Sequence, residues 1–202
     1  MRVLVACEFS GIVRDAFATK GHDAWSCDLL PTEQPGQHIQ DDVLKHLNDG
    51  WDLMIAHPPC TYLTYAGAAY WNDPGRASKR DAALNFFLAL YDAPIEMVAI
   101  ENPRGYPSKV FRPCDQEVNP FDFGEPVRKR VCLWLKNLPP LMCGASVAVE
   151  PSGYCIKSNG RRYNYYYHQG KSSKRRSVFF ESIANAMADQ WGGLQPQGVS
   201  GE

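Results

Sequence analysis

The fold of this chain is decided at residues 51–60, WDLMIAHPPC. Trp51 to Ala56 is apolar almost throughout, as expected for a strand that is buried on both faces of a sheet. Two prolines then stiffen the corner at which the chain leaves this strand, and Cys60 follows them. A cysteine that only fills a core does not need such a corner. Two interpretations stay open: a packed thiol, or a nucleophile held at the carboxyl end of a strand.

Strand-like and helix-like segments alternate on both sides of this stretch. Strands are expected at 2–7, 22–27, 95–100 and 131–135, and helices at 11–20, 42–47, 76–91 and 179–191. The alternation predicts an α/β fold with a doubly wound, mostly parallel sheet. Sites in such sheets lie outside the carboxyl ends of the strands. The polar residues that follow the strands are Glu8, Asp28, His57, Cys60 and Glu101. The pattern therefore predicts one site at this edge.

Charge is distributed unevenly along the chain. Residues 151–180 hold seven Lys and Arg and no acid, whereas the rest holds 14 basic and 22 acidic residues. Tyrosines interleave with these basic residues, which suits contact with phosphates and stacking on bases, although a run of charge is more often a solvated surface. We expect a catalytic domain over 1–136 and 177–194, a small, irregular, basic and Tyr-rich insertion at 137–176 for target recognition, and a loose tail at 195–202.

The remaining composition excludes several classes of protein. Hydrophobic residues at 45% and charged residues at 21% are ordinary for a globular domain. The seven cysteines form no CxxC pair, so we expect no metal site. The chain begins with a strand-like run instead of a signal peptide, and no apolar run reaches membrane-spanning length. We therefore expect a cytoplasmic protein with no membrane partner.

Two strand ends in the first half of the chain suggest a nucleotide-like ligand. The loop at Phe9 to Gly11 joins a strand to a helix, where glycine permits close approach and the helix start offers N–H groups. Asp28 ends the next strand, where an acid commonly accepts hydrogen bonds from ribose hydroxyls. The alternatives are an ordinary turn and a solvated or capping acid.

Two later segments carry groups suited to acid–base chemistry and anion binding. Glu101 could act as a general acid or as a hydrogen-bond acceptor, or it could simply cap the turn that follows. Arg128 and Arg130 could hold a phosphate or a pyrimidine carbonyl through fork-like hydrogen bonds, or they could be the exposed start of a strand.

Taken in order, these segments resemble the cytosine-5 DNA methyltransferases, in the compact form that phage genomes often encode. The residues that carry the resemblance are Phe9-Ser10-Gly11, Asp28, Asp42-Val43, Pro58-Pro59-Cys60, Glu101-Asn102, Arg128-Lys129-Arg130 and the segment Phe179 to Trp191. In that family they correspond to the S-adenosylmethionine loop, the acid on the cofactor's ribose, the acid near its adenine, the nucleophile motif, the Glu-Asn motif, the spaced arginines and the last helical motif. The chain departs from the pattern at Ile12-Val13, at Pro126 and at Glu181 to Ala184.

The resemblance implies a fold of the class I S-adenosylmethionine-dependent methyltransferase type, in a bacterial or phage-infected cell. It implies transfer of a methyl group from S-adenosylmethionine to C5 of cytosine in DNA through a covalent Cys60–C6 adduct, as in restriction-modification. The implied catalytic residues are Cys60, Glu101, Arg128 and Arg130. The implied cofactor contacts are Glu8, Phe9, Ser10, Gly11, Asp28, Leu29, Asp42, Val43 and Pro58. The candidate DNA contacts are Arg161, Arg162, Lys171, Lys174, Arg175 and Arg176.

Three other functions stay open on the sequence. The chain could bind nucleic acid on a methyltransferase scaffold with little or no catalysis. It could methylate an exocyclic amine, although His57 and Cys60 stand where such enzymes place an Asp, Asn or Ser and an aromatic residue. It could also act on free pyrimidine nucleotides, since the insertion at 137–176 is small.

Overall fold

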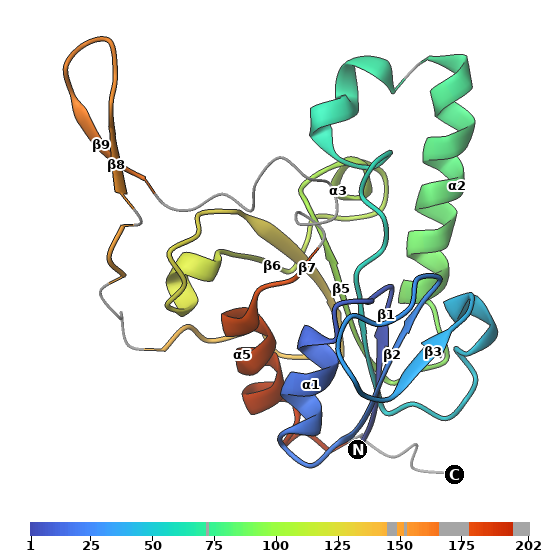
Figure 1. The fold of residues 1–202 in the computed structure, drawn as a ribbon. Coiled ribbons are helices and arrows are strands. Elements are labelled where there is room, and N and C mark those ends of the chain that lie inside the picture. Colours follow the sequence, from blue (N-terminus) through green and yellow to red (C-terminus); the bar gives the residue numbers. More distant parts are fainter. Residues whose placement is uncertain (72, 145–148, 152, 166–177, 196–202) are drawn as a thin grey trace.

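A seven-stranded sheet forms the centre of the protein. The computed structural model describes residues 1–71, 73–144, 149–151, 153–165 and 178–195. The strands are β1 (Arg2–Ala6), β2 (Asp23–Asp28), β3 (His38–Gln40), β4 (Leu53–Ala56), β5 (Met97–Asn102), β6 (Gln116–Val118) and β7 (Val131–Lys136). They lie in the order β3-β2-β1-β4-β5-β7-β6 (Figure 1). All neighbours pair in parallel except β7, which runs antiparallel to β5 and β6. The predicted α/β fold with a mostly parallel sheet is confirmed.

Helices cover both faces of this sheet. The helices are α1 (Ile12–Ala18), α2 (Pro74–Tyr91), α3 (Tyr106–Val110) and α5 (Glu181–Trp191), with 3-10 turns η1 (Val43–Lys45), η2 (Tyr65–Tyr70) and η3 (Pro120–Phe123). Leu53 and Ile55 of β4 belong to the apolar cluster that includes α1 and α5. Met54 and Ala56 belong to the cluster on the opposite face, with Phe87 of α2. Because successive side chains of a strand point to opposite faces, a strand covered on both sides is apolar throughout.

The strand order reverses between β1 and β4. From β1 the chain proceeds outward through β2 to β3, and then returns to the other side of β1 to form β4 and β5. The loops that leave β1 and β4 therefore diverge to opposite sides and leave room between them, which is where ligands bind in open α/β sheets. The stretch at His57 to Cys60 follows β4 directly, so the topology places it at this switch point.

Several elements differ from those expected. The segment expected to be a helix at 42–47 forms only the short turn η1, capped by the Asp42 side chain, which accepts from Leu44 N. Helix α2 begins earlier than expected, because Asp73 caps it and Pro74 suits the first helical position. The three-residue strands β3 and β6 were missed, because so few residues show no periodicity.

The insertion at 137–176 was predicted to be irregular, and this is wrong for part of it. Strands β8 (Gly153–Ile156) and β9 (Arg162–Tyr165) pair as an antiparallel hairpin that stands apart from the main sheet (Figure 1). Gly160 adopts a φ of 73° in the connecting turn, a backbone conformation that glycine adopts without strain. Among the described residues, no helix combines the length and the apolar character needed to cross a membrane.

Candidate active site

Two loops meet at the switch point, one after β1 and one after β4. The backbone N–H of His57 donates to Ala6 O at 2.9 Å, and that of Glu8 donates to Cys27 O at 3.2 Å. These bonds extend the parallel pairing just beyond the ends of the strands. They set the positions from which the segments Cys7 to Ser10 and His57 to Cys60 diverge.

Glu8 points inward and caps helix α1. Its side chain is only 4% exposed, and its carboxylate accepts from Val13 N at 2.7 Å and from Arg14 N at 3.2 Å. Burial raises the pKa of Glu8, while the nearby His57 charge and these hydrogen bonds lower it. The side chains of Phe9 and Ser10 are buried as well. Of the loop residues assigned to cofactor binding, these three therefore offer a ligand mainly their backbone.

The stability of the protein should respond to the protonation of Glu8. Because burial raises the folded-state pKa, the folded protein binds more protons than the unfolded chain between the two pKa values. Stability from this group therefore falls as pH rises through the folded pKa. We expect urea denaturation to show that the unfolding free energy of the natural protein, relative to Glu8→Gln, increases as the pH is lowered from above the raised pKa toward the ordinary glutamate value of 4.5. The exposed-site variant Glu150→Gln is the control, and a difference for Glu8→Gln that is independent of pH would contradict the prediction.

A buried arginine holds the loop between β2 and β3 against α1. The Arg14 side chain is 1% exposed and donates to Ser26 Oγ at 3.2 Å and to Thr32 Oγ1 at 3.1 Å. It also donates to two carbonyl oxygens, those of Gln34 and Pro35. A Cβ on Gly11, in the loop between β1 and α1, would lie 2.5 Å from the guanidinium, and φ at this position is 79°, so the position requires a residue without a side chain. Sequence reasoning missed Arg14, although an arginine on the apolar side of a short helix is a usable signal.

Acids and exposed leucines lie beyond β2 and β3. Asp28 Oδ1 accepts from Leu30 N at 2.9 Å, which forms a turn at the end of β2. Leu29 is 72% exposed beside it, and Leu44 is also exposed. An acceptor carboxylate next to exposed apolar side chains suits a ligand with ribose hydroxyls and a planar base. Val43 was assigned to cofactor binding, but its side chain is buried in the apolar core.

The loop that contains Cys60 is tethered on both sides. The buried Asn102 Nδ2 donates to Pro58 O at 2.7 Å, so the end of β5 holds the loop before the cysteine. After the cysteine, Tyr106 N donates to Leu63 O at 2.6 Å. A Cβ on Gly105 would lie 2.0 Å from that same carbonyl oxygen, so the close approach requires glycine. Cys60 is thus positioned by two bonds to segments more than 40 residues further along the chain.

Glu101 and His57 form a direct contact between β5 and the loop after β4. Their atoms Nδ1 and Oε2 lie 3.2 Å apart, with side chains 9% exposed for His57 and 15% for Glu101. The ring of Phe179, just before α5, packs on the His57 ring with centroids 4.6 Å apart. The structure therefore brings Glu101 and the Pro58 loop together, as the sequence predicted, and adds His57 and Phe179 to them.

The interior cysteines differ from Cys60 in their surroundings. Burial raises the pKa of the Cys27 thiol to about 11. Burial likewise raises the pKa values of Cys7 and Cys132. These thiols stay protonated near neutral pH and pack as small apolar groups. Cys60, in contrast, is half-buried on a loop outside the sheet.

Arg128 and Arg130 lie at the same edge of the sheet as Glu101, because β7 starts where β5 ends. Asn102 pairs in register with Cys132, two residues after Arg130. The structure gives each arginine another partner. Arg130 Nη1 lies 3.5 Å from Glu117 Oε2, and the Arg128 guanidinium lies 4.0 Å from the centre of the Phe121 ring.

A cluster of Cys114, Glu117 and Cys132 lies next to these arginines. Its ligand-type atoms lie within 4.8 Å of one another. Arg130 and Arg104 both approach the Glu117 carboxylate. The side chains of Cys114 and Cys132 are hydrogen-bonded to each other, and this bond helps to keep the Cys132 thiol protonated. We assign no metal to it, because the carboxylate already has cationic partners. Sequence reasoning missed the cluster, since its members come from separate segments.

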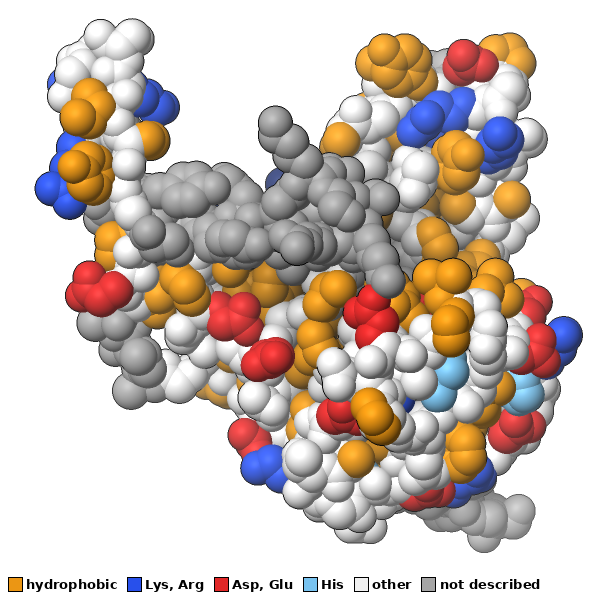
Figure 2. Space-filling model, in the orientation of Figure 1, with side chains coloured by type: hydrophobic (Ala, Val, Ile, Leu, Met, Phe, Trp, Pro, Cys, Tyr) orange, Lys and Arg blue, Asp and Glu red, His pale blue; other side chains and the backbone are white. Residues whose placement is uncertain are grey.

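The candidate DNA contacts fall partly on the β8–β9 hairpin. Arg161 and Arg162 are exposed, and the Arg162 guanidinium lies 4.1 Å from the centre of the Tyr154 ring. Figure 2 shows basic side chains on the hairpin at one end of the molecule and acidic side chains scattered over the body. The remaining predicted contacts, Lys171, Lys174, Arg175 and Arg176, lie outside the described residues.

A second group of basic and aromatic side chains follows Cys60. The Arg76 guanidinium and the Lys79 ammonium lie 5.1 and 5.9 Å from the centre of the Tyr62 ring. Tyr65 and Tyr70 of η2 are exposed nearby in the chain. Such a surface suits backbone phosphates and unstacked bases. Sequence reasoning missed this surface, because its residues are spread over the loop after Cys60, the turn η2 and helix α2.

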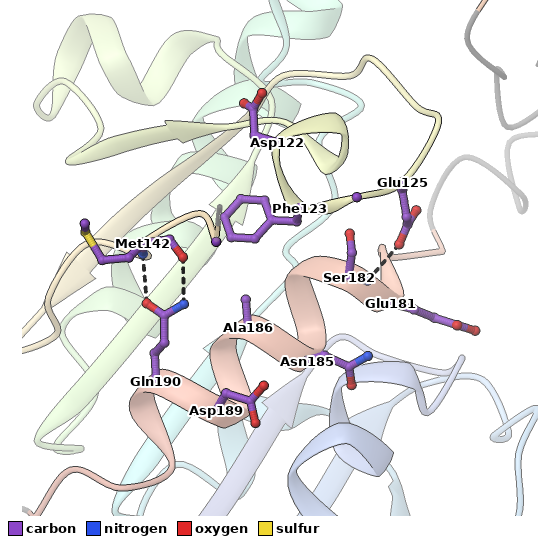
Figure 3. A pocket seen from close by; sticks show the side chains of 12 residues that line it. Asp122, Phe123, Glu125, Met142, Glu181, Ser182, Asn185, Ala186, Asp189 and Gln190 are labelled. Atoms are coloured by element: carbon purple, nitrogen blue, oxygen red, sulfur yellow. Dashed lines mark hydrogen bonds between the residues drawn. The ribbon is translucent and has the colours of Figure 1, made fainter. Parts of the chain in front are cut away.

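An acidic cavity lies away from the switch point. It has a volume of about 590 Å³ and lies between η3, the segment at Met142 and helix α5 (Figure 3). Gln190 bonds to the Met142 backbone through both amide atoms, and Glu125 accepts from Ser182 N at 2.7 Å. Four acids line it, namely Asp122, Glu125, Glu181 and Asp189. Their charge disfavours a phosphate-bearing ligand here.

Comparison with known proteins adds nothing to this geometry: neither a scan of protein-family models nor a search of curated proteins found a match. The side chains that the sheet brings together are therefore the basis on which a function is inferred.

Proposed function

We propose that this protein is an S-adenosylmethionine-dependent DNA cytosine-5 methyltransferase with a fold of the class I methyltransferase type. One observation carries the proposal: the loop of His57 to Cys60 and the strand end at Glu101-Asn102 are hydrogen-bonded to each other at the switch point of the sheet. A half-buried thiol on a tethered loop and an acid at the neighbouring strand end are the two groups that nucleophilic attack on a pyrimidine requires.

In the proposed reaction, the Cys60 thiolate adds to carbon 6 of cytosine and the ring electrons move toward N3. Glu101 supplies the proton that N3 then takes up. The addition makes carbon 5 nucleophilic, so that it can accept a methyl group. Loss of the carbon 5 proton to water, expulsion of Cys60 as a thiolate and return of the N3 proton to Glu101 restore the aromatic ring. In duplex DNA the base must first leave the stack, at a cost of a few kcal/mol.

The arginines at the start of β7 have a part in this proposal. Arg130, with Arg128, would hold the ring carbonyl or an adjacent phosphate. Arg130 would have to leave Glu117 to do so. Because its side chain is 72% exposed, that ion pair contributes little stability and its loss is tolerable.

The residues beyond β1, β2 and β3 fit S-adenosylmethionine, which supplies an electrophilic methyl group when bound. The backbone at Phe9 to Gly11 would approach its amino-acid portion, and Asp28 would accept from its ribose hydroxyls. The exposed Leu29 side chain and the half-buried Asp42 carboxylate would lie beside its base. The support for this assignment is the combination of acids and exposed leucines, and the loop that Arg14 holds against α1.

Removing the charge of Asp28 should weaken binding of S-adenosylmethionine. A hydrogen bond to a charged acceptor contributes about 1.5–3 kcal/mol, so Asp28→Asn should raise the dissociation constant about 10- to 100-fold. Asn keeps an oxygen for the turn to Leu30 N. Calorimetry checks the effect, with Asp23→Asn at the opposite end of β2 as the control. Equal affinity of Asp28→Asn and the natural protein would contradict the assignment.

A polymeric DNA substrate predicts a salt-dependent role for the hairpin. Each phosphate contact contributes about 0.9 to the slope of log affinity against log salt concentration. The double variant Arg161→Ala/Arg162→Ala should therefore reduce that slope by about 1 to 2. Lys20→Ala, which removes a charge paired with Asp189 on the α1–α5 face, should leave it unchanged. Binding with no salt dependence in the natural protein would favour a free nucleotide as substrate.

The product of the reaction tests the function directly. DNA from cells that express the protein would be sequenced at base resolution for 5-methylcytosine and digested for mass spectrometry. We expect 5-methylcytosine, absent from cells that carry Cys60→Ser. N4-methylcytosine or N6-methyladenine would show that the target is an exocyclic amine. DNA without any new methylation would favour a protein that only binds nucleic acid.

A further inference from the structure

His57 lies between two carboxylates in the interior. Its Nδ1 lies 3.2 Å from Glu101 Oε2, and its charge acts on the buried Glu8, which faces it from the loop after β1. Among the described residues, the segment before α5 places Phe179, an uncharged side chain, against the ring. The Cys7 thiol lines a small cavity together with His57 and Glu8. Burial raises the pKa of this thiol, so the thiol stays neutral. An imidazole in direct contact with a carboxylate can exchange a proton with it.

The other ring nitrogen of His57 is buried and has no hydrogen-bond partner among the described residues. A buried polar atom left without a partner costs about 1–3 kcal/mol, which is a large cost for a residue that only fills space. His57 lines a cavity of about 10 Å³ together with Glu8 and Ser10. That volume is about enough for one water molecule, which would connect the His57 ring to the polar groups of the other residues that line the cavity.

The chemistry proposed for Glu101 requires a proton that the solvent cannot readily supply. The Glu101 side chain is 15% exposed, and His57 is its direct hydrogen-bonding neighbour. We propose that His57 is a positioning residue that orients Glu101 and carries the proton that Glu101 delivers to the substrate ring. The inference depends on the proposed function, and it names a residue that the family resemblance does not assign.

The pair supplies one proton and takes it back. When Cys60 adds to carbon 6, the His57 Nδ1 proton passes through the Glu101 carboxylate to N3, which leaves a neutral imidazole beside an ionised Glu101. When Cys60 is expelled as a thiolate, N3 returns that proton through Glu101 to His57, while the carbon 5 proton that the methyl group replaces leaves to water. Over one turnover His57 neither gains nor loses a proton. A neutral imidazole could orient Glu101 but could not supply this proton, so the proposed step requires the protonated ring.

Two variants separate orientation from proton transfer. His57→Asn keeps an N–H near the position of Nδ1 but cannot carry a second proton, whereas His57→Phe retains packing on Phe179 and loses both functions. We expect His57→Asn to lower kcat about 10- to 100-fold, with unchanged KM for DNA and with a flat pH profile. His57→Phe should be slower still. His22→Asn, at the opposite end of the sheet, should behave as the natural protein does. Natural kcat and pH dependence in His57→Asn would overturn the inference.

Nuclear magnetic resonance tests the pair without any need for activity. The titration curve of the His57 ring C–H resonances should move to lower pH in Glu101→Gln, because the loss of a carboxylate disfavours the charged ring. An unchanged curve would overturn the inference even if the His57 variants fail to fold. If the natural protein does not methylate DNA, the proposed function fails, and the resonance experiment alone then decides whether His57 and Glu101 share a proton.

Discussion

Cys60→Ser is expected to lower the rate of methyl transfer by about 10³-fold or more, because removal of a catalytic nucleophile abolishes most of the rate enhancement. A serine hydroxyl stays protonated at neutral pH and needs an adjacent base, whereas a thiol yields its anion far more readily. Serine is close to cysteine in size, so the tethers from Asn102 and Tyr106 to this loop should remain.

The measurement is a covalent adduct with DNA that contains 5-fluorocytosine. Fluorine at carbon 5 cannot leave as a proton would, so an enzyme that attacks carbon 6 stays attached to the DNA. We expect the natural protein to form this adduct and Cys60→Ser to form none. The matched controls are Cys143→Ser and Cys155→Ser, which remove exposed thiols away from the switch point. An adduct that persists in Cys60→Ser would refute the role of this residue.

Glu101→Gln is expected to lower the rate about 10²- to 10⁴-fold, the usual contribution of a positioned acid. Glutamine keeps the size and hydrogen-bonding capacity of the side chain, but it cannot give a proton to N3. The buried Asn102 amide should still bond to Pro58 O, so the Cys60 loop should keep its place. The expected loss is therefore in the chemical step and not in stability.

Single-turnover rates at saturating DNA and S-adenosylmethionine check this expectation. Glu96→Gln changes an acid just before the opposite end of the same strand and serves as the control. Denaturation midpoints should agree among the three proteins. A rate for Glu101→Gln within a factor of about two of the natural rate would contradict an acid role for Glu101.

Most of the sheet could be predicted from local patterns. β1, β4 and β5 each contain a continuous apolar run, and a strand covered on both faces leaves that signature wherever it occurs. The antiparallel direction of β7 and the hairpin β8–β9 could not be predicted with the same means. A strand's direction depends on which neighbour it meets, and its own sequence does not record that neighbour.

The sequence predicted which strand ends carry the candidate site, but it did not predict the contacts that the side chains make there. The sequence indicated that Glu8 and Glu101 follow strands, and both lie at the expected edge. The structure shows that Glu8 turns inward to cap α1, whereas Glu101 turns toward His57. Arg14 was missed because its partners are carbonyl and hydroxyl oxygens of a loop without any pattern.

The sequence by itself determined the longer apolar strands and the polar residues at their ends, because strand periodicity and turn chemistry are local properties of the chain. Only the tertiary structure decided which of these residues meet. His57 reaches Glu101, and Pro58 reaches Asn102, each across 44 positions. Those contacts exist because the sheet places β4 beside β5, and strand order is a property of the packed core.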